Sequence, residues 1–177
     1  LVEFHASEIG RDVFGYNIPH APLVGALERI ADEAGIVRFD AQATAFELRD
    51  DEARIVAGDG SALVARLVGA ADGRNSPARE AAGIKVQSWR YPQSALVVNI
   101  THALPHDDVS TEFHTETGPF TFVPLPGLAS AVVCVERPAE AERLMALDDE
   151  ALAAEFERRS QFLLGAIRID GRRQLFP

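Results

Sequence analysis

The chain has 177 residues, 47% of them hydrophobic and 25% charged, which is the composition of an ordinary globular protein. Its formal net charge of −10 argues against a nucleic-acid partner, because such binding normally needs a basic face. No apolar run approaches the roughly 18 residues of a membrane span, and no stretch reads as a signal peptide. This length suffices for one core together with a smaller second lobe.

The first third of the sequence predicts one helix and several short strands. Residues 1–14 begin with an alternating Val2 and Phe4 pattern, which predicts a strand or an edge segment. Apolar residues then recur at helical spacing after Pro22, and Gly35 is expected to end this helix. Strands are expected next at 36–39, 45–49, 54–57 and 63–68. A hairpin-type connection leads into the strand at 63–68.

The stretch from Leu63 to Arg79 predicts a buried strand, a tight turn and the start of a helix. Gly69 and Gly73 mark sharp backbone turns, and Ser76 followed by Pro77 is typical of the first residues of a helix. A carboxylate just past a strand end, here Asp72, is suited to ribose hydroxyls, and a helix N-terminus beside it favours phosphate. The pattern therefore indicates a nucleotide site, although a bare Asp-Gly pair also occurs in ordinary strand-to-helix turns.

The whole string Gly69-Ala70-Ala71-Asp72-Gly73-Arg74-Asn75-Ser76-Pro77-Ala78-Arg79 resembles the Asp-Gly motif of the FAD-dependent aromatic hydroxylases, the flavin monooxygenases of the p-hydroxybenzoate hydroxylase type. It departs from the usual pattern in that two alanines, rather than one, separate the first glycine from the aspartate. The resemblance implies that Asp72, Gly73 and Arg79 bind the FAD cofactor. It also implies that Asp72 touches flavin ribose and lies near the path of NAD(P)H, the co-substrate.

The second half of the chain predicts a largely antiparallel sheet followed by two helices and a last strand. Helical spacing of leucines begins after Pro138, and Asp148 to Glu150 place negative charge at the start of the second helix, which Gly165 is expected to stop. The strands are expected at 84–86, 95–100, 110–114, 120–125, 129–135 and 167–176.

These elements and the resemblance together predict an α+β fold: a mostly antiparallel or mixed β-sheet substrate domain flanked by helices, attached to part of an FAD-binding, Rossmann-like α/β domain. The expected division is 1–83 for the partial FAD-binding domain, with a β-meander and the Asp-Gly motif, and 84–177 for the substrate-binding domain. The complete flavin site of the family also needs a Gly-x-Gly-x-x-Gly loop and a second Gly-Asp-Ala motif, and the sequence contains neither. The chain is therefore expected to be an internal fragment that alone neither holds FAD tightly nor catalyses a reaction.

Within this family the sequence is most similar to the 2-polyprenyl-6-methoxyphenol hydroxylase branch of ubiquinone biosynthesis. The residues that suggest the branch lie at 14–19, 112–113, 118–120, 123–126 and 135–140. This likeness implies a monooxygenase that hydroxylates a phenolic, polyprenylated ring with NAD(P)H and dioxygen. It implies a cytoplasmic protein and leaves open a peripheral contact with the inner membrane. The alternatives are a flavin hydroxylase of another soluble aromatic substrate and a non-catalytic binding module that retains the fold.

Phe120, Phe122 and Pro124 share one face of a predicted strand, because side chains alternate across a strand. The resemblance implies that this face helps to form the roof over the aromatic substrate, where His114 could also lie; the alternative is that the three residues fill a core. No catalytic residue is assigned, because the cofactor performs the hard chemistry in such enzymes.

The other reactive side chains carry weaker signals. Cys134 lies in an apolar run and is interpreted as a small core residue of a reduced protein. The spacing of His102 and His106 permits a metal site, but Pro105 between them favours an exposed loop. His20 falls where some relatives bind flavin pyrophosphate, and its alternative is a solvent-exposed loop residue.

Overall fold

The computed structural model describes residues 2–177, which form two compact units. One unit comprises Arg29–Arg90, and the other comprises Tyr91–Pro177 together with the N-terminal segment through Glu28. The sequence divided the chain at 83/84, between its two expected domains, and that functional division stays a prediction. The described residues include no helix with the length and apolar character needed to cross a bilayer.

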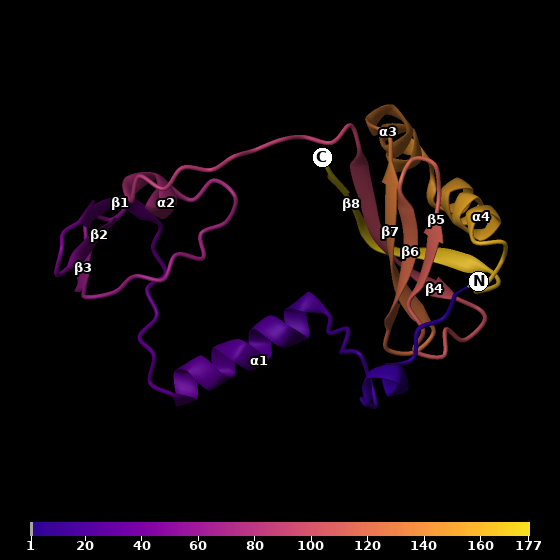
Figure 1. The fold of residues 1–177 in the computed structure, drawn as a ribbon, viewed down its shortest axis with the longest axis horizontal. Helices are drawn as coiled ribbons and strands as arrows, with labels where there is room; N and C mark the ends of the chain where they lie inside the picture. Colours follow the sequence, from indigo (N-terminus) through magenta and orange to yellow (C-terminus); the bar gives the residue numbers. More distant parts are fainter. Residues whose placement is uncertain (1) are drawn as a thin grey trace. The chain divides into compact units, whose positions relative to one another are not determined.

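The N-terminal segment contains a short 3₁₀ turn, η1 (Ala6–Ile9), and the long helix α1 (His20–Glu33) (Figure 1). The strand expected over residues 1–14 is therefore wrong for the described part, since Ala6–Ile9 is helical. The expected helix is confirmed, and it ends before Gly35, whose φ of 70° is a left-handed value that glycine adopts without strain.

The smaller unit holds an antiparallel meander of three strands, β1 (Ala43–Leu48), β2 (Ala53–Ala57) and β3 (Ala62–Ala65), and the short helix α2 (Pro77–Ala81). The strand expected at 36–39 is wrong, because this segment is irregular. The strand expected to be buried over 63–68 ends at Ala65, pairs antiparallel with β2 and leaves Leu67 88% exposed. An apolar run becomes a buried strand only where neighbours cover it on both faces.

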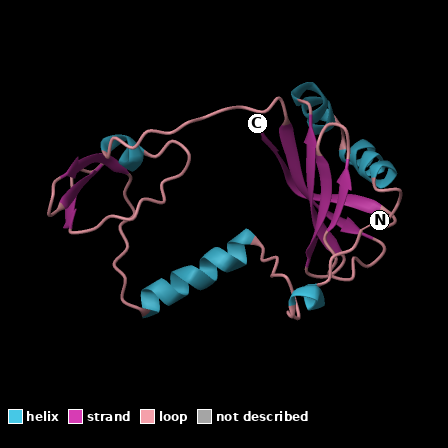
Figure 2. Ribbon diagram, viewed as in Figure 1, coloured by secondary structure: helices cyan, strands magenta, loops and turns pink. Residues whose placement is uncertain are grey.

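The larger unit is built on an antiparallel sheet, drawn in magenta in Figure 2. Its five strands lie in the order β5-β6-β7-β4-β8. Its strands are β4 (Ser94–His102), β5 (Thr111–His114), β6 (Pro119–Leu125), β7 (Ala129–Glu136) and β8 (Ile167–Phe176). The expected antiparallel sheet is confirmed, except that residues 84–86 are irregular. On β4, β6 and β7 buried residues alternate with more exposed ones, so one face of the sheet forms the core.

Two helices, α3 (Pro138–Ala146) and α4 (Asp149–Arg159), cover that buried face (Figure 1). Helix α4 begins where the charge pattern predicted, because the Asp148 carboxylate accepts a hydrogen bond from the Ala151 amide at 2.7 Å. It ends at Arg159, well before the expected stop at Gly165. The core residues from sheet and helices form one cluster: Leu96, Val98, Ile100, Phe120, Phe122, Val132, Cys134, Leu144, Leu152, Ala153, Phe156, Leu164 and Ile167.

The edge strand β8 contains a bulge, and a side chain of this bulge contacts the helices. Val97 pairs with Gln174 and Asn99 with Asp170, so four residues of β8 advance along two residues of β4. Within this bulge Arg173 donates hydrogen bonds to the carbonyl of Met145 at 3.1 Å, to that of Leu147 and to the Asp149 carboxylate. The corner between α3 and α4 is therefore fastened to the sheet by one side chain.

Candidate cofactor-binding site

The candidate site is the loop between β3 and α2, in the smaller unit. Residues 66–76 contain no strand, and Gly73 has a φ of 87°, which turns the chain back toward the helix. This left-handed conformation is costly for a residue with a side chain, so glycine is the residue suited to this position. The turn brings Asp72 to the start of α2, as the sequence predicted for a strand-turn-helix unit.

Every amide in the first turn of α2 has a partner within the protein. Pro77 has no N–H, the Ala78 amide donates to Asp72 Oδ2 at 3.2 Å, and the Arg79 amide donates to Ser76 Oγ at 3.0 Å. The Glu80 amide donates to the Ser76 carbonyl at 3.3 Å. The helix is also only five residues long. The expectation that this helix N-terminus favours phosphate is therefore not met. Its amide N–H groups already have partners within the protein, and one of these partners is the Asp72 carboxylate.

Asp72 is held as an acceptor. The pKa of its carboxyl is lowered from the ordinary value, and the largest cause is the nearby hydroxyl of Ser76, a residue that is 6% exposed. The Ala78 amide and the nearby Arg79 charge also favour the ionised form. A carboxylate has about four lone-pair positions, so hydroxyl groups of a ligand can still donate to it. The arrangement suits the hydroxyls of a sugar rather than a phosphate.

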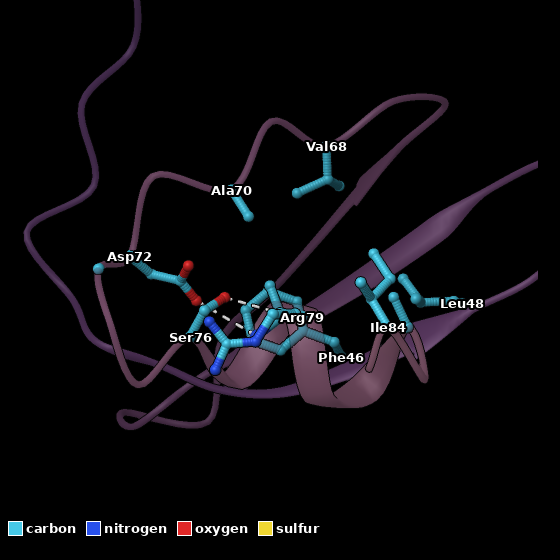
Figure 3. Close-up of a pocket in the computed structure, with 11 residues that line it drawn as sticks. Phe46, Leu48, Val68, Ala70, Asp72, Ser76, Arg79 and Ile84 are labelled. Carbon is cyan, nitrogen blue, oxygen red and sulfur yellow. Dashed lines mark hydrogen bonds between the residues drawn. The ribbon is translucent and has the colours of Figure 1, made fainter. Parts of the chain in front are cut away.

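Arg79 closes the same loop from the other side. Its Nη1 donates to the carbonyl of Arg74 at 3.0 Å, while the side chain lies beside Asp72 and Ser76 (Figure 3). A guanidinium carries five N–H donors in a fixed plane, so this contact leaves donors for a ligand. The structure thus brings together Asp72, Gly73 and Arg79, the three predicted cofactor residues; their role as a flavin site stays a prediction.

These residues line a hollow of about 450 Å³ that lies wholly within the smaller unit (Figure 3). One end is polar and carries Asp72, Ser76 and Arg79. The remaining wall is mostly apolar and is formed by Phe46, Leu48, Val68, Ala70, Ala78, Ala82 and Ile84. A hollow with an apolar wall and few oriented polar groups is typical of small-molecule sites. The apolar wall and Ser76 were not assigned to the site from the sequence.

The predicted substrate residues Phe120, Phe122 and Pro124 lie on the covered face of β6. Phe120 is 1% exposed, and its ring packs 5.5 Å from that of Phe156 in α4. The opposite face of the strand, with Thr121 and Val123, is only half-buried. The structure thus shows the three residues in the core, and their predicted role in substrate binding is not tested by it. His114, also considered, lies on β5 with its side chain exposed.

The remaining candidates form no further site among residues 2–177, where no group of three or more metal-ligating side chains occurs. His102 is buried: its Nδ1 donates to the Leu104 carbonyl at 2.8 Å, and its Nε2 is hydrogen-bonded to the Ser130 hydroxyl, 3.0 Å away. The exposed loop expected for His102 and His106 is thus wrong, because His106 also turns inward and hydrogen-bonds the Leu125 carbonyl. His20 is the exposed first residue of α1.

Comparison with known proteins gives no match to any family model, but clear relatives among curated proteins. Ubiquinone hydroxylase UbiL of Rhodospirillum rubrum is 41% identical over 115 residues, which are 65% of this chain and 27% of the relative. The 3-demethoxyubiquinol 3-hydroxylase of Escherichia coli is 29% identical over 94% of this chain and 43% of the relative. The chain is homologous to the hydroxylases of ubiquinone biosynthesis.

This homology agrees with the resemblance found in the sequence, down to the ubiquinone branch. The mouse ubiquinone biosynthesis monooxygenase COQ6 is a third relative, 30% identical over 78% of this chain and 32% of its own length. The chain spans less than half of the length of each of these relatives.

Solved flavoprotein structures share the fold. A flavoprotein/dehydrogenase from Cytophaga hutchinsonii superposes with a TM-score of 0.71 at 14% identity, over 92% of this chain and 42% of that one. PqsL of Pseudomonas aeruginosa, described as a probable FAD-dependent monooxygenase, superposes in its complex with 2-aminobenzoylacetate with a TM-score of 0.66 at 23% identity, over 87% of this chain and 45% of that one. The predicted α+β fold of an FAD-dependent monooxygenase is thereby confirmed.

Proposed function

We propose that this chain carries part of the cofactor site and the substrate domain of an FAD-dependent monooxygenase. The enzyme hydroxylates a phenolic, polyprenylated ring in ubiquinone biosynthesis, with NAD(P)H as reductant and dioxygen as oxidant. The observation that carries the proposal is the Asp72 carboxylate, held ionised at the polar end of an apolar hollow in a chain homologous to ubiquinone hydroxylases.

The residues of the loop fit a flavin nucleotide. Asp72 accepts hydrogen bonds from ribose hydroxyls, Gly73 lets the backbone approach the ligand closely, and Arg79 supplies donors and positive charge. The apolar wall suits the flat, weakly hydrated part of the cofactor. The bound flavin supplies the redox chemistry, and the protein orients it and excludes water.

The five-stranded sheet carries the substrate side of the proposal. Phe120, Phe122 and Pro124 fix the shape of β6 from its covered face, and the open face of the same strand presents Thr121 and Val123. A phenol needs an apolar surface with a few hydrogen-bonding groups, and the open face offers one side chain of each kind, Val123 and Thr121. A polyprenyl chain on the ring also implies a peripheral contact with a membrane, where such a substrate resides.

The test compares visible absorption spectra of this 177-residue chain and of the product of the complete reading frame that encodes it. A flavin spectrum in the longer protein, with NAD(P)H oxidation stimulated by a prenylated phenol, is the expected result. If the longer protein stays colourless after incubation with FAD, the monooxygenase proposal fails and a non-catalytic binding module replaces it. If it binds FAD but only soluble phenols stimulate oxidation, the substrate assignment fails alone.

A further inference from the structure

We propose that His114 accepts the proton of the phenol substrate, and that Glu112 is a positioning residue that holds the His114 ring for this task. Both side chains lie beside Thr121 on the open face of the five-stranded sheet. The inference rests on the proposed function, because it assigns the two residues a role in the hydroxylation of a phenol. The resemblance suggested only that His114 could lie near the substrate.

The strand register puts Glu112 and His114 on the open face. Phe113, the residue between them, is paired with Phe120 and packs against the core. Because side chains alternate across a strand, the two neighbours of Phe113 point to the opposite face. Glu112 is paired with Thr121 of β6, so these two side chains are neighbours on that face.

The open face changes from polar to apolar with distance from β5. In the row that begins with Glu112 and Thr121, the next residues are Val133 of β7 and Val97 of β4. Both valines are half-buried. A phenol has the same division, since its ring is apolar and its hydroxyl is polar. A ring that packs on the valines can therefore direct its hydroxyl toward β5.

Both oxygens of the Glu112 carboxylate have neighbours on this face. Oε2 accepts a hydrogen bond from the Thr121 hydroxyl at 3.2 Å, and Oε1 lies 3.4 Å from Nε2 of His114. The carboxylate therefore favours the tautomer of His114 that carries its hydrogen on Nε2. This tautomer leaves Nδ1 as an acceptor. The His114 side chain is 87% exposed, so a ligand can reach it.

A neutral imidazole in this tautomer can take the proton of a phenol. The phenol O–H bond breaks, its electron pair stays on the phenol oxygen, and the proton forms a bond with Nδ1 of His114. The Glu112 carboxylate stabilises the imidazolium that results. A phenolate releases more electron density into its ring than a phenol does, so the ring carbons accept oxygen more readily. The proton then passes from the exposed imidazole to water.

The strands around this pair carry no other ionisable side chain among the described residues. β5 is the edge strand, and its one neighbour, β6, consists of uncharged residues. The next charged residue along the chain is Glu116, in the turn between the two strands. Glu116→Gln is therefore a control for a change of charge near His114 that leaves the Glu112 carboxylate in place.

The first experiment uses the complete gene product and 4-nitrophenol, a phenol whose ionised form absorbs visible light. Bound to the wild-type protein, the probe is expected to absorb as nitrophenolate at a pH at which the free probe is largely neutral. His114→Ala should bind it in the neutral form. Glu112→Gln should do the same, because an amide N–H beside Nε2 makes that atom the acceptor and moves the ring hydrogen to Nδ1. Glu116→Gln should behave as wild type.

The second readout is turnover of a prenylated phenol. A well-placed proton acceptor contributes about a hundredfold, so His114→Ala should lower kcat by about that factor with little change in KM. Added imidazole should restore part of the loss. The matched control is His5→Ala, because His5 Nε2 lies 3.6 Å from Glu3 Oε2, at the same spacing in the chain but in a segment without strands. This control should leave kcat and the probe spectrum unchanged.

The outcomes separate the inference from the proposed function. Identical probe spectra in wild type and His114→Ala, or an unchanged kcat in that variant, overturns the role of His114 while the flavin-dependent hydroxylase stands. Loss of the nitrophenolate spectrum in His114→Ala but not in Glu112→Gln overturns the positioning role of Glu112. Failure of the wild-type product to bind FAD overturns the proposed function and with it the task of His114 in hydroxylation.

Discussion

Cys134 shows how strongly position controls the chemistry of a single residue. The thiol lies in the core of the larger unit, and burial raises its pKa to about 11. We predict that it reacts with a thiol reagent such as dithionitrobenzoate at pH 8 about two hundredfold more slowly than a free thiol, because thiolate is the reactive form. Full reactivity should appear in denaturant. Rapid labelling of the folded chain would show that the thiol is accessible and would contradict this prediction.

Asp72 is predicted to behave in the opposite way, as a group that stays charged. Its lowered pKa means that the ionised carboxylate persists above 3.8 and is lost only as the pH falls through the lowered value. FAD affinity of the complete gene product should therefore be flat from about pH 7 to about pH 5 and decline only below that range. Equilibrium dialysis at a series of pH values checks this. A decline beginning near pH 6 would point to another titrating group.

Asp72→Asn tests the charge itself. The amide keeps the size of the side chain but loses one acceptor oxygen, so we expect FAD affinity to fall about tenfold or more, as charge-assisted hydrogen bonds are the stronger kind. Flavin fluorescence during dilution of the complete gene product measures the loss. Retention of flavin equal to wild type would refute the role of the carboxylate.

At the scale of elements, Arg159 joins the helices to the sheet. Its guanidinium hydrogen-bonds Glu136 of β7 at 2.5 Å, Glu140 of α3 at 3.0 Å and Glu155 of its own helix at 2.8 Å. Glu136 is buried, so removing the cation leaves a carboxylate without its partner. We predict that Arg159→Ala lowers the free energy of unfolding by about 3 kcal/mol.

The neighbouring Arg158 is the control for this prediction. It pairs with Glu155 at 2.8 Å on the exposed surface of the same helix. Arg158→Ala should change the unfolding free energy by less than about 0.5 kcal/mol. Urea denaturation followed by circular dichroism measures both variants. Equal effects would mean that the buried network contributes no more than a surface pair.

Gly118 permits close packing at the start of β6. A Cβ atom built there would lie 2.6 Å from Cγ1 of Val135, closer than real carbon atoms approach. We predict that Gly118→Ala destabilises the larger unit by about 2 kcal/mol through overpacking. Adding Val135→Ala should recover part of that loss, because it removes Cγ1, the nearest clashing atom, while Cβ at 2.8 Å stays. A double variant less stable than the sum of the two single changes would exclude this explanation.

At the scale of the whole molecule, the segment between the two units is the predicted site of proteolysis. Residues 84–93 form no helix or strand, and Trp89 is 71% exposed. Every residue of the core cluster lies beyond them, between Leu96 and Ile167. Limited trypsin digestion should cut at Lys85 or Arg90 and leave a resistant fragment that begins near Tyr91. Mass spectrometry identifies it; degradation of that fragment at the same rate as the linker would contradict the prediction.

The sequence predicted the strands whose side chains alternate between a buried face and a more exposed face. β4, β6 and β7 alternate cleanly because each pairs with another strand of the same sheet. Residues 36–39, 66–68 and 84–86 are equally apolar but form no strand, and apolar character alone does not reveal where a pairing partner lies. At the site, the resemblance to the Asp-Gly motif predicted that Asp72, Gly73 and Arg79 would lie together. The occupation of the α2 amides depends on the orientation of side chains, which spacing does not specify.

The contact of Arg173 with the helical corner also bears on how this unit matures during synthesis. The carbonyls of Met145 and Leu147 leave the ribosome more than twenty residues before the guanidinium that binds them. The helices can form early, but their corner keeps unpaired carbonyls until β8 has docked beside β4. Docking of β8 is therefore the last step in forming this unit. A nascent unit without β8 exposes the edge of β4 and the unpaired carbonyls at the corner between α3 and α4.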